Sequence, residues 1–248
     1  YFGEDCNSYS VRTFRDAMEA IEEGAADYAV LPIENSTAGA VNEVYDLLVE
    51  FENYIVGEVI IPITHTLAGL PGTQLSELKR VYSKAEALMQ TTRFLEEHSD
   101  WQQISVANTA IAAKKILDDQ DRTQAAVCSA YAAKVYGLEV LEDNINDESG
   151  NCTRFIIVTN QKVFLKGAKK ISICFEVPHE SGSLYHLLSH FIYNDLNMSK
   201  IESRPIEGRS WEYRFFVDFE GNLEEPGVKN ALRGLREESR SLKILGNY

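Results

Sequence analysis

The chain has 248 residues, a formal net charge of −14 and a hydrophobic share of 44%. That length allows two or three compact units, and the acidic balance argues against a nucleic-acid partner, because phosphate binding needs basic surface. No apolar run approaches the ~20 residues that cross a bilayer, and the start, Tyr1–Asp5, has neither the basic region nor the apolar core of a signal peptide. We therefore expect a cytoplasmic protein without membrane contact.

Helices and strands alternate over the first two thirds of the chain. The hydrophobic period and the breakers predict helices over 12–24 and 37–50 and strands over 28–33 and 55–67. A second series has strands 78–82, 104–107, 125–128 and 155–158 and helices 86–97, 109–118 and 129–136. Such alternation favours α/β units with parallel sheets, and two series predict two lobes around a cleft.

The pattern changes near Lys166–Lys170. From there we expect strand 171–177, helix 183–194, strands 198–206 and 212–219, helix 226–238 and strand 241–245. This βαββαβ order is the ferredoxin-like arrangement. We therefore predict one domain over 1–167 and a second over 168–248.

Small polar residues gather where predicted strands end and helices begin, at Glu34–Gly39, Asn108–Ala110 and Ser129. Helix capping explains any one of them. Together they indicate a pocket for a small, multiply charged carboxylate, because strand carboxyl ends share a crevice and helix N-termini attract anions. Gly39 would let the backbone approach such a ligand closely.

A fourth contribution is the segment Asn151–Phe155, which reads Asn-Cys-Thr-Arg-Phe. Arginine can pair with both oxygens of a carboxylate, and the neighbouring hydroxyl of Thr153 can donate a proton. A structural Arg154, paired to one of the chain's many acidic residues, is an equal alternative.

No metal site is expected. The four cysteines lack the short paired spacing of zinc sites and redox motifs, so we predict reduced, mostly buried thiols. His186 and His190 have a spacing that can bind metal, but no cysteine or carboxylate nearby completes a ligand set. His65 is expected to be a hydrogen-bonded structural residue.

Several segments resemble the signature segments of the prephenate dehydratase family. They are Leu31–Ser36, Ile63–Leu67, Tyr136–Leu138 and Asn151–Phe155, of which the Thr-Arg-Phe triplet is the most specific. The C-terminal part resembles the family's phenylalanine-binding regulatory ACT domain, through Asn197–Pro205 and Leu245–Tyr248. The resemblance extends from Phe14 to the end.

This resemblance implies conversion of prephenate to phenylpyruvate, with loss of water and carbon dioxide and without a metal or organic cofactor. It also implies a catalytic part of two α/β lobes, like those of periplasmic binding proteins. The implied catalytic residues are Asn151, Thr153, Arg154 and Phe155. The implied substrate contacts are Asn35, Ser36, Thr37, Gly39, Ser83, Asn108, Thr109 and Ala110.

The resemblance also implies regulation by L-phenylalanine, bound between ACT domains of a homodimer or dimer of dimers. The implied effector residues are Gly182, Ser183, Leu184, Asn197, Glu202, Ser203 and Arg204. The Gly182 group of one subunit would face the Glu202 group of its partner.

The chain departs from the family pattern in three places. It starts after the family's first strand and Gly-rich turn, so we expect either that an N-terminal portion is lost or left out, with a fused chorismate mutase domain as one possibility, or that one lobe is incomplete. In both cases we expect incomplete activity of this piece. Ser83–Glu86 reads Ser-Lys-Ala-Glu where members carry Ser-His-Pro-Gln, and Ser181–Leu184 reads Ser-Gly-Ser-Leu instead of Pro-Gly-Ala-Leu.

Two alternatives remain open at this point. An arogenate dehydratase would act on the aminated form of the substrate. A non-catalytic module that binds an amino acid or carboxylate would also have two α/β lobes around an anion cleft.

Overall fold

The computed structural model describes residues 1–3 and 5–248, which form two compact units. Unit 1 contains Tyr1–Ile61 and Thr153–Tyr248, and unit 2 contains Pro62–Cys152. The chain therefore passes from one unit to the other twice. No helix in the described part of the chain is long and apolar enough to span a membrane.

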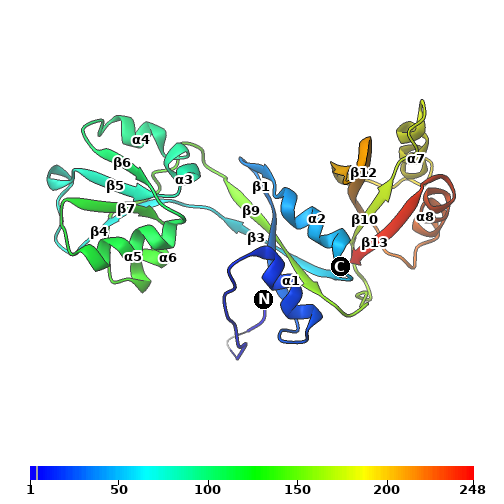
Figure 1. The fold of residues 1–248 in the computed structure, drawn as a ribbon, viewed down its shortest axis with the longest axis horizontal. Helices are drawn as coiled ribbons and strands as arrows, with labels where there is room; N and C mark the ends of the chain where they lie inside the picture. The colour runs from blue at the N-terminus through cyan, green and yellow to red at the C-terminus, as the bar shows by residue number, and fades with distance from the viewer. Residues whose placement is uncertain (4) are drawn as a thin grey trace. The chain divides into compact units, whose positions relative to one another are not determined.

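The first part of unit 1 packs two helices on strands from two separate stretches of the sequence (Figure 1). The helices are α1 (Phe14–Glu22) and α2 (Asn42–Glu50), and the strands are β1 (Ala29–Asn35), β2 (Gly39–Ala40), β3 (Tyr54–Pro62) and β9 (Cys152–Thr159). Helix α1 begins at a capping box, in which Thr13 and Asp16 each bond the other's backbone amide. Its buried face, Met18 and Ile21, joins the core of this part.

The second part of unit 1 has the predicted βαββαβ order, so that prediction is confirmed. Its elements are β10 (Lys170–Glu176), α7 (Ser183–Ile192), β11 (Met198–Ile206), β12 (Arg209–Glu220), α8 (Pro226–Glu238) and β13 (Ser241–Asn247). Alternate residues of β10 enter two cores: Phe175 packs with α7 and α8, whereas Cys174 belongs to the core of α1 and α2. Both faces of this strand are therefore buried.

The two parts of unit 1 share one eight-stranded sheet, in the order β11-β12-β10-β13-β3-β9-β1-β2. The join is a parallel pairing of Gly246 on β13 with Ile55 on β3. A Cβ on Gly246 would lie 2.2 Å from the carbonyl oxygen of Ile55, so only glycine fits this contact. The predicted sequence boundary at 167/168 lies inside this unit and stays a prediction.

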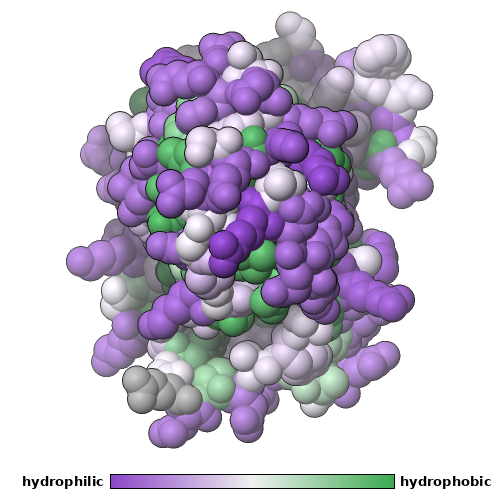
Figure 2. Space-filling model, turned by 90° about the vertical axis from the view of Figure 1, so that its left-hand side faces the viewer, coloured by the Kyte–Doolittle hydropathy of each residue, from purple (hydrophilic) through white to green (hydrophobic). Residues whose placement is uncertain are grey.

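Unit 2 is a five-stranded sheet, ordered β6-β5-β7-β4-β8, with helices packed on it. Its elements are β4 (Thr66–Gly69), a 3-10 turn (Leu75–Glu77), β5 (Arg80–Ser83), α3 (Ala85–Met89), α4 (Thr92–Glu96), β6 (Gln102–Ser105), α5 (Thr109–Asp119), β7 (Gln124–Cys128), α6 (Ala130–Val135) and β8 (Glu139–Glu142). Strand β5 pairs in parallel with β6 and β7, whereas β4 is antiparallel to β7 and β8. Figure 2 shows one face of the molecule, on which hydrophilic residues predominate.

Three predicted elements are wrong in detail. The predicted strand 55–67 is two strands in different sheets, β3 and β4, because the chain leaves the first sheet after Pro62, which has no amide hydrogen to donate. The predicted helix 86–97 is interrupted at Thr91, whose hydroxyl bonds the carbonyl oxygens of Ala87 and Leu88. The parallel pairing predicted for both lobes is wrong in unit 1 for β1 and β9, which run antiparallel, whereas β3 and β13 are parallel.

Candidate active site

A hydrogen bond between Asn35 and Thr153 is the centre of the candidate site. The register of β1 and β9 places these residues opposite each other. The Asn35 side-chain amide donates to the Thr153 hydroxyl oxygen at 2.9 Å. The side-chain oxygen of Asn35, Oδ1, accepts hydrogen bonds from the backbone amides of Thr37 at 3.0 Å and Ala38 at 2.8 Å. These bonds leave the side-chain NH₂ group of Asn35 to face Thr153.

This geometry prepares Thr153 as a donor. The residue is only 9% exposed, so its hydroxyl is held in a largely dry position. A hydroxyl oxygen that accepts a hydrogen bond becomes a better donor of its own proton, because bonds in a chain polarise one another. The pair can therefore stabilise negative charge that develops on a ligand oxygen.

The turn after Asn35 differs from the sequence-based expectation. Glu34–Gly39 does not begin a helix: Asn35 closes a turn, Gly39 has φ +83° and starts the short strand β2, and α2 begins at Asn42. The positive φ explains the glycine. The Thr37 amide is already bonded to Asn35, so it is not an oriented anion donor as expected. Ser36, Thr37 and Gly39 are exposed beside the pair.

Arg154 faces away from Thr153, because successive side chains of a strand point to opposite faces. Its guanidinium contacts Asp218 at 2.7 Å, Glu58 at 3.3 Å and Glu34 at 3.4 Å, and its side chain is 13% exposed. Burial is the largest single effect on the pKa of Arg154 and lowers it, but the charge of Asp218, its hydrogen bond and the two nearby tyrosines together raise the net pKa. The ion-paired alternative for Arg154 is therefore what the structure shows. Phe155 is half-buried opposite Pro32.

In unit 2, the predicted polar residues Asn108–Ala110 and Ser129 follow the carboxyl ends of β6 and β7. Both strands are parallel to β5, so these ends lie on the same side of the sheet. Asn108 caps α5 by accepting from the amide of Ile111 at 2.8 Å, and Ser129 caps α6 by accepting from Ala132 at 3.1 Å. Thr109 and Ala110 form the first turn of α5, with Thr109 half-buried and Ala110 exposed.

Ser83 has a structural role that its sequence context does not reveal. It is 0% exposed, and its hydroxyl donates to the carbonyl oxygen of Val127 at 2.6 Å. This bond ties β5 to β7, and the substrate contact expected for Ser83 stays a prediction.

A buried polar cluster precedes Thr153 in the chain. Gln90 accepts from the Asn151 side chain at 3.1 Å and bonds the His65 ring at 3.0 Å, while the Asn151 carbonyl accepts from the amide of Ile63 at 2.8 Å. His65 is 6% exposed and Asn151 is 7% exposed. The structural role predicted for His65 is confirmed, and Asn151 holds the loop that leads into β9. Sequence reasoning missed Gln90, which carries no local signal.

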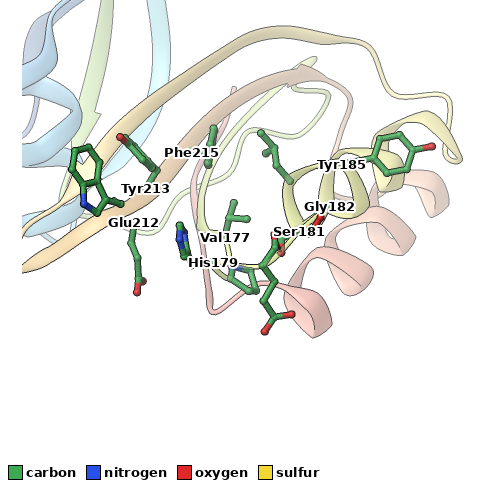
Figure 3. A pocket seen from close by; sticks show the side chains of 13 residues that line it. Val177, His179, Ser181, Gly182, Tyr185, Glu212, Tyr213 and Phe215 are labelled. Carbon is green, nitrogen blue, oxygen red and sulfur yellow. Dashed lines mark hydrogen bonds between the residues drawn. The ribbon is translucent and has the colours of Figure 1, made fainter.

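The predicted effector residues fall into two groups. Gly182, Ser183 and Leu184 line a pocket at the start of α7, where Gly182 has φ +83°. Val177, Tyr213 and Phe215 line the same pocket (Figure 3).

The second effector group lies on β11 or just before it, outside this pocket. Asn197 bonds Glu220, Ser203 is exposed, and the side chains of Glu202 and Arg204 are half-buried. Within the described residues, no group of three or more His, Cys, Asp or Glu side chains is arranged to hold a metal ion.

Comparison with known proteins decides the family. The family model described as prephenate dehydratase matches residues 1–163. The chain belongs to the prephenate dehydratase family. The bifunctional chorismate mutase/prephenate dehydratase of Aquifex aeolicus is 39% identical over 250 residues, an alignment that covers 100% of this chain and 68% of that protein.

Solved structures of the prephenate dehydratase family share the fold. The enzyme from Arthrobacter aurescens, solved in complex with L-Phe, aligns with a TM-score of 0.87 at 33% identity, over 96% of this chain and 80% of that chain. A protein described as GqqA, a novel type of quorum-quenching acylase, aligns with a TM-score of 0.87 at 32% identity, over 95% of this chain and 86% of that chain. The chain spans 61 to 68% of the length of curated relatives, among them an arogenate dehydratase/prephenate dehydratase of Arabidopsis thaliana.

Proposed function

We propose that this chain catalyses the decarboxylating dehydration of prephenate to phenylpyruvate and that L-phenylalanine inhibits it. The Asn35–Thr153 hydrogen bond carries the proposal, because it prepares a donor for the oxygen that leaves the substrate. Membership of the prephenate dehydratase family supports the same activity.

The reaction needs a donor at the leaving oxygen. When the ring carboxylate of prephenate departs as carbon dioxide, its bonding electron pair enters the ring, and the ring becomes aromatic as the C–O bond to the hydroxyl breaks. The hydroxyl takes a proton, ultimately from solvent, and leaves as water. Thr153 is a weak acid, so its contribution is a hydrogen bond that stabilises charge on that oxygen in the transition state.

Other residues position the reacting groups in this proposal. Arg154 anchors β9 from the opposite face, and Asn151 anchors the loop before it. The predicted substrate contacts Ser36, Thr37 and Gly39, and likewise Asn108, Thr109 and Ala110, belong to this proposal as polar groups for the substrate carboxylates and keto group. Orientation of a bound substrate by such groups supplies much of the acceleration in reactions of this type.

The pocket at Gly182–Leu184 supports a phenylalanine site, because its wall of Val177, Tyr213 and Phe215 suits an aromatic side chain. The second predicted group, on β11, would come from a partner subunit. A homodimer or dimer of dimers, a cytoplasmic location and a fused chorismate mutase domain in the longer protein belong to the same proposal.

Substitution of Thr153 tests the activity. Thr153→Val keeps the shape but removes the hydroxyl, so we expect kcat for phenylpyruvate formation at neutral pH to fall roughly 100-fold with little change in KM. Thr153→Ser should retain most activity. Thr159→Val is the matched control, since Thr159 lies buried on the same strand away from Asn35.

Three results would contradict the proposal. Wild-type turnover by Thr153→Val would remove Thr153 from the reaction. Turnover of arogenate but not prephenate would make the chain an arogenate dehydratase. Ligand binding without product from either substrate would favour a non-catalytic binding module.

A further inference from the structure

Four charged side chains from four strands of unit 1 lie together and are called the charged set below: Glu34, Arg154, Lys200 and Asp218. In the sheet register, Glu34 on β1 lies opposite Arg154 on β9, and Lys200 on β11 lies opposite Asp218 on β12. Across the set, Lys200 contacts Glu34 at 2.6 Å and Arg154 contacts Asp218 at 2.7 Å. Each cross-strand pair therefore presents one positive and one negative charge to the other pair.

Three of the four side chains are shielded from water. The side chains of Arg154, Asp218 and Lys200 are 13%, 13% and 14% exposed, and that of Glu34 is 34% exposed. Glu58 and Lys170 extend the set, since Glu58 contacts both Arg154 and Lys170. Charges with little access to water depend strongly on their partners, because removal of one partner leaves the other uncompensated.

Strand β11 has two different faces. Its even-numbered residues Lys200, Glu202 and Arg204 are half-buried, whereas Ser199, Ile201, Ser203 and Pro205 are exposed. Arg204 makes two bonds to the carboxylate of Asp46 on α2, at 3.0 and 2.6 Å. The inner face of the predicted effector strand is thus bound to α2 through Arg204 and to β1, the strand that carries Asn35, through Lys200.

The charged set is adjacent in the chain to the candidate catalytic pair. Glu34 precedes Asn35, and Arg154 follows Thr153. Because Glu34 and Asn35, and Arg154 and Thr153, are joined through one backbone but face opposite ways, a movement of the charged side chains can reach the candidate catalytic pair through the strand itself. A displacement of about 1 Å at a reacting group can cost about 100-fold in rate.

We propose that Lys200 is a positioning residue that couples the effector strand β11 to the Asn35–Thr153 pair through its ion pair with Glu34. A ligand that binds on the exposed face of β11 would move the strand, and Glu34 and Arg154 would pass that movement to the site. The proposal rests on the proposed function, because it takes L-phenylalanine as the effector. It assigns the coupling to named side chains within one subunit.

Lys200→Met tests the coupling, because methionine keeps most of the side-chain length without the charge. The first readout is hydrogen exchange of the backbone amides of residues 34–38 and 153–156, with and without L-phenylalanine. We expect phenylalanine to change this exchange in the wild type and not in Lys200→Met, while calorimetry shows phenylalanine still bound. Lys200→Arg should restore the response, and Lys229→Met, an exposed lysine on α8, is the matched control.

The second readout is inhibition. We expect the phenylalanine concentration that halves turnover to rise about tenfold or more in Lys200→Met. A change of this size is typical when the coupling between an effector site and an active site is lost. If Lys200→Met folds poorly, the double variant Glu34→Gln/Lys200→Met removes both charges together and serves in its place.

The outcomes separate this proposal from the proposed function. A wild type that does not turn over prephenate overturns the proposed function, and the exchange measurement still decides the coupling. The coupling is overturned if bound phenylalanine leaves exchange at these amides unchanged in the wild type, if Lys200→Met responds like the wild type, or if phenylalanine does not bind at all. A purely structural Lys200 would lower stability in the variant but leave the phenylalanine response intact.

Discussion

At the scale of single residues, the hydroxyl of Tyr45 near the charged set is a buried polar group whose hydrogen-bonding capacity is unused within the described part of the chain. The residue is 5% exposed, and within residues 1–3 and 5–248 its buried hydroxyl has no hydrogen-bond partner. Burial and the nearby charge of Asp218 raise the pKa of Tyr45, so the hydroxyl stays neutral. Its ring packs edge to face on Phe216 at 4.9 Å between centroids, and this contact needs no hydroxyl.

Tyr45→Phe should therefore stabilise the protein. Removal of a buried donor without a partner relieves a desolvation cost, and we expect the free energy of unfolding in urea to rise by about 1 kcal/mol. Tyr54→Phe is the contrasting control, because the Tyr54 hydroxyl donates to Glu52 at 2.7 Å, and this variant should be destabilised. A larger loss of stability in Tyr45→Phe than in Tyr54→Phe would show that the Tyr45 hydroxyl has a favourable contact.

At the scale of elements, short-range patterns predicted the second part of unit 1 well, since each of its helices and strands has a clear hydrophobic period and breakers at its ends. These patterns failed where a side chain hydrogen-bonded to the backbone in place of a helical contact. The Asn35 side chain forms a turn where a helix was predicted to begin, and the Thr91 hydroxyl interrupts a second predicted helix.

The candidate site was predictable only in part. The segments around Asn35 and Thr153 stood out in the sequence, and strand alternation alone implies that Thr153 and Arg154 face opposite ways. The partners of Arg154 were not predictable, because Asp218 lies 64 residues away and many carboxylates could have paired with it. Gln90 was missed for the same reason, since its contact with Asn151 spans 61 residues.

The contacts between the neighbouring strands β10 and β12 show how one buried carboxylate joins two strands. Glu176 accepts from Arg209 and Arg214 at 2.6 Å each, and its side chain is 9% exposed. Burial raises the pKa of Glu176, but the bonds from the two arginines outweigh burial and the net pKa is lowered below its usual value of 4.5. The folded state therefore favours the charged form more than the unfolded state does.

Glu176 should make stability depend on pH in the acid range. A carboxyl whose folded pKa is depressed contributes stability above the unfolded pKa and loses it as pH falls through the folded pKa. We expect Glu176→Gln to lower the free energy of unfolding by about 2 kcal/mol at pH 7, with the difference from wild type narrowing below about pH 4.5. Urea titrations between pH 3 and pH 7 measure this, with Glu50→Gln at an exposed pair as control; a difference independent of pH would contradict it.

At the scale of the whole molecule, each unit has a core of its own and a buried cysteine within it. Cys174 lies in the core of unit 1 and Cys128 in a core of unit 2. Burial raises the pKa of each thiol to about 11, so both are protonated and unreactive at neutral pH. Cys6 is exposed and Cys152 is half-buried, so the prediction of mostly buried thiols holds fully for only two of the four.

The buried thiols of Cys128 and Cys174 can report separately on the stability of the two units. In the native protein we expect iodoacetamide to modify Cys6 first, Cys152 more slowly, and Cys128 and Cys174 only when their cores open. Because the cores are distinct and the chain passes between the units only at 61/62 and 152/153, the urea midpoints for labelling of Cys128 and Cys174 should differ. Peptide mass spectrometry after brief labelling across a urea series measures both midpoints in one sample. Coincident midpoints would contradict independent unfolding of the two units.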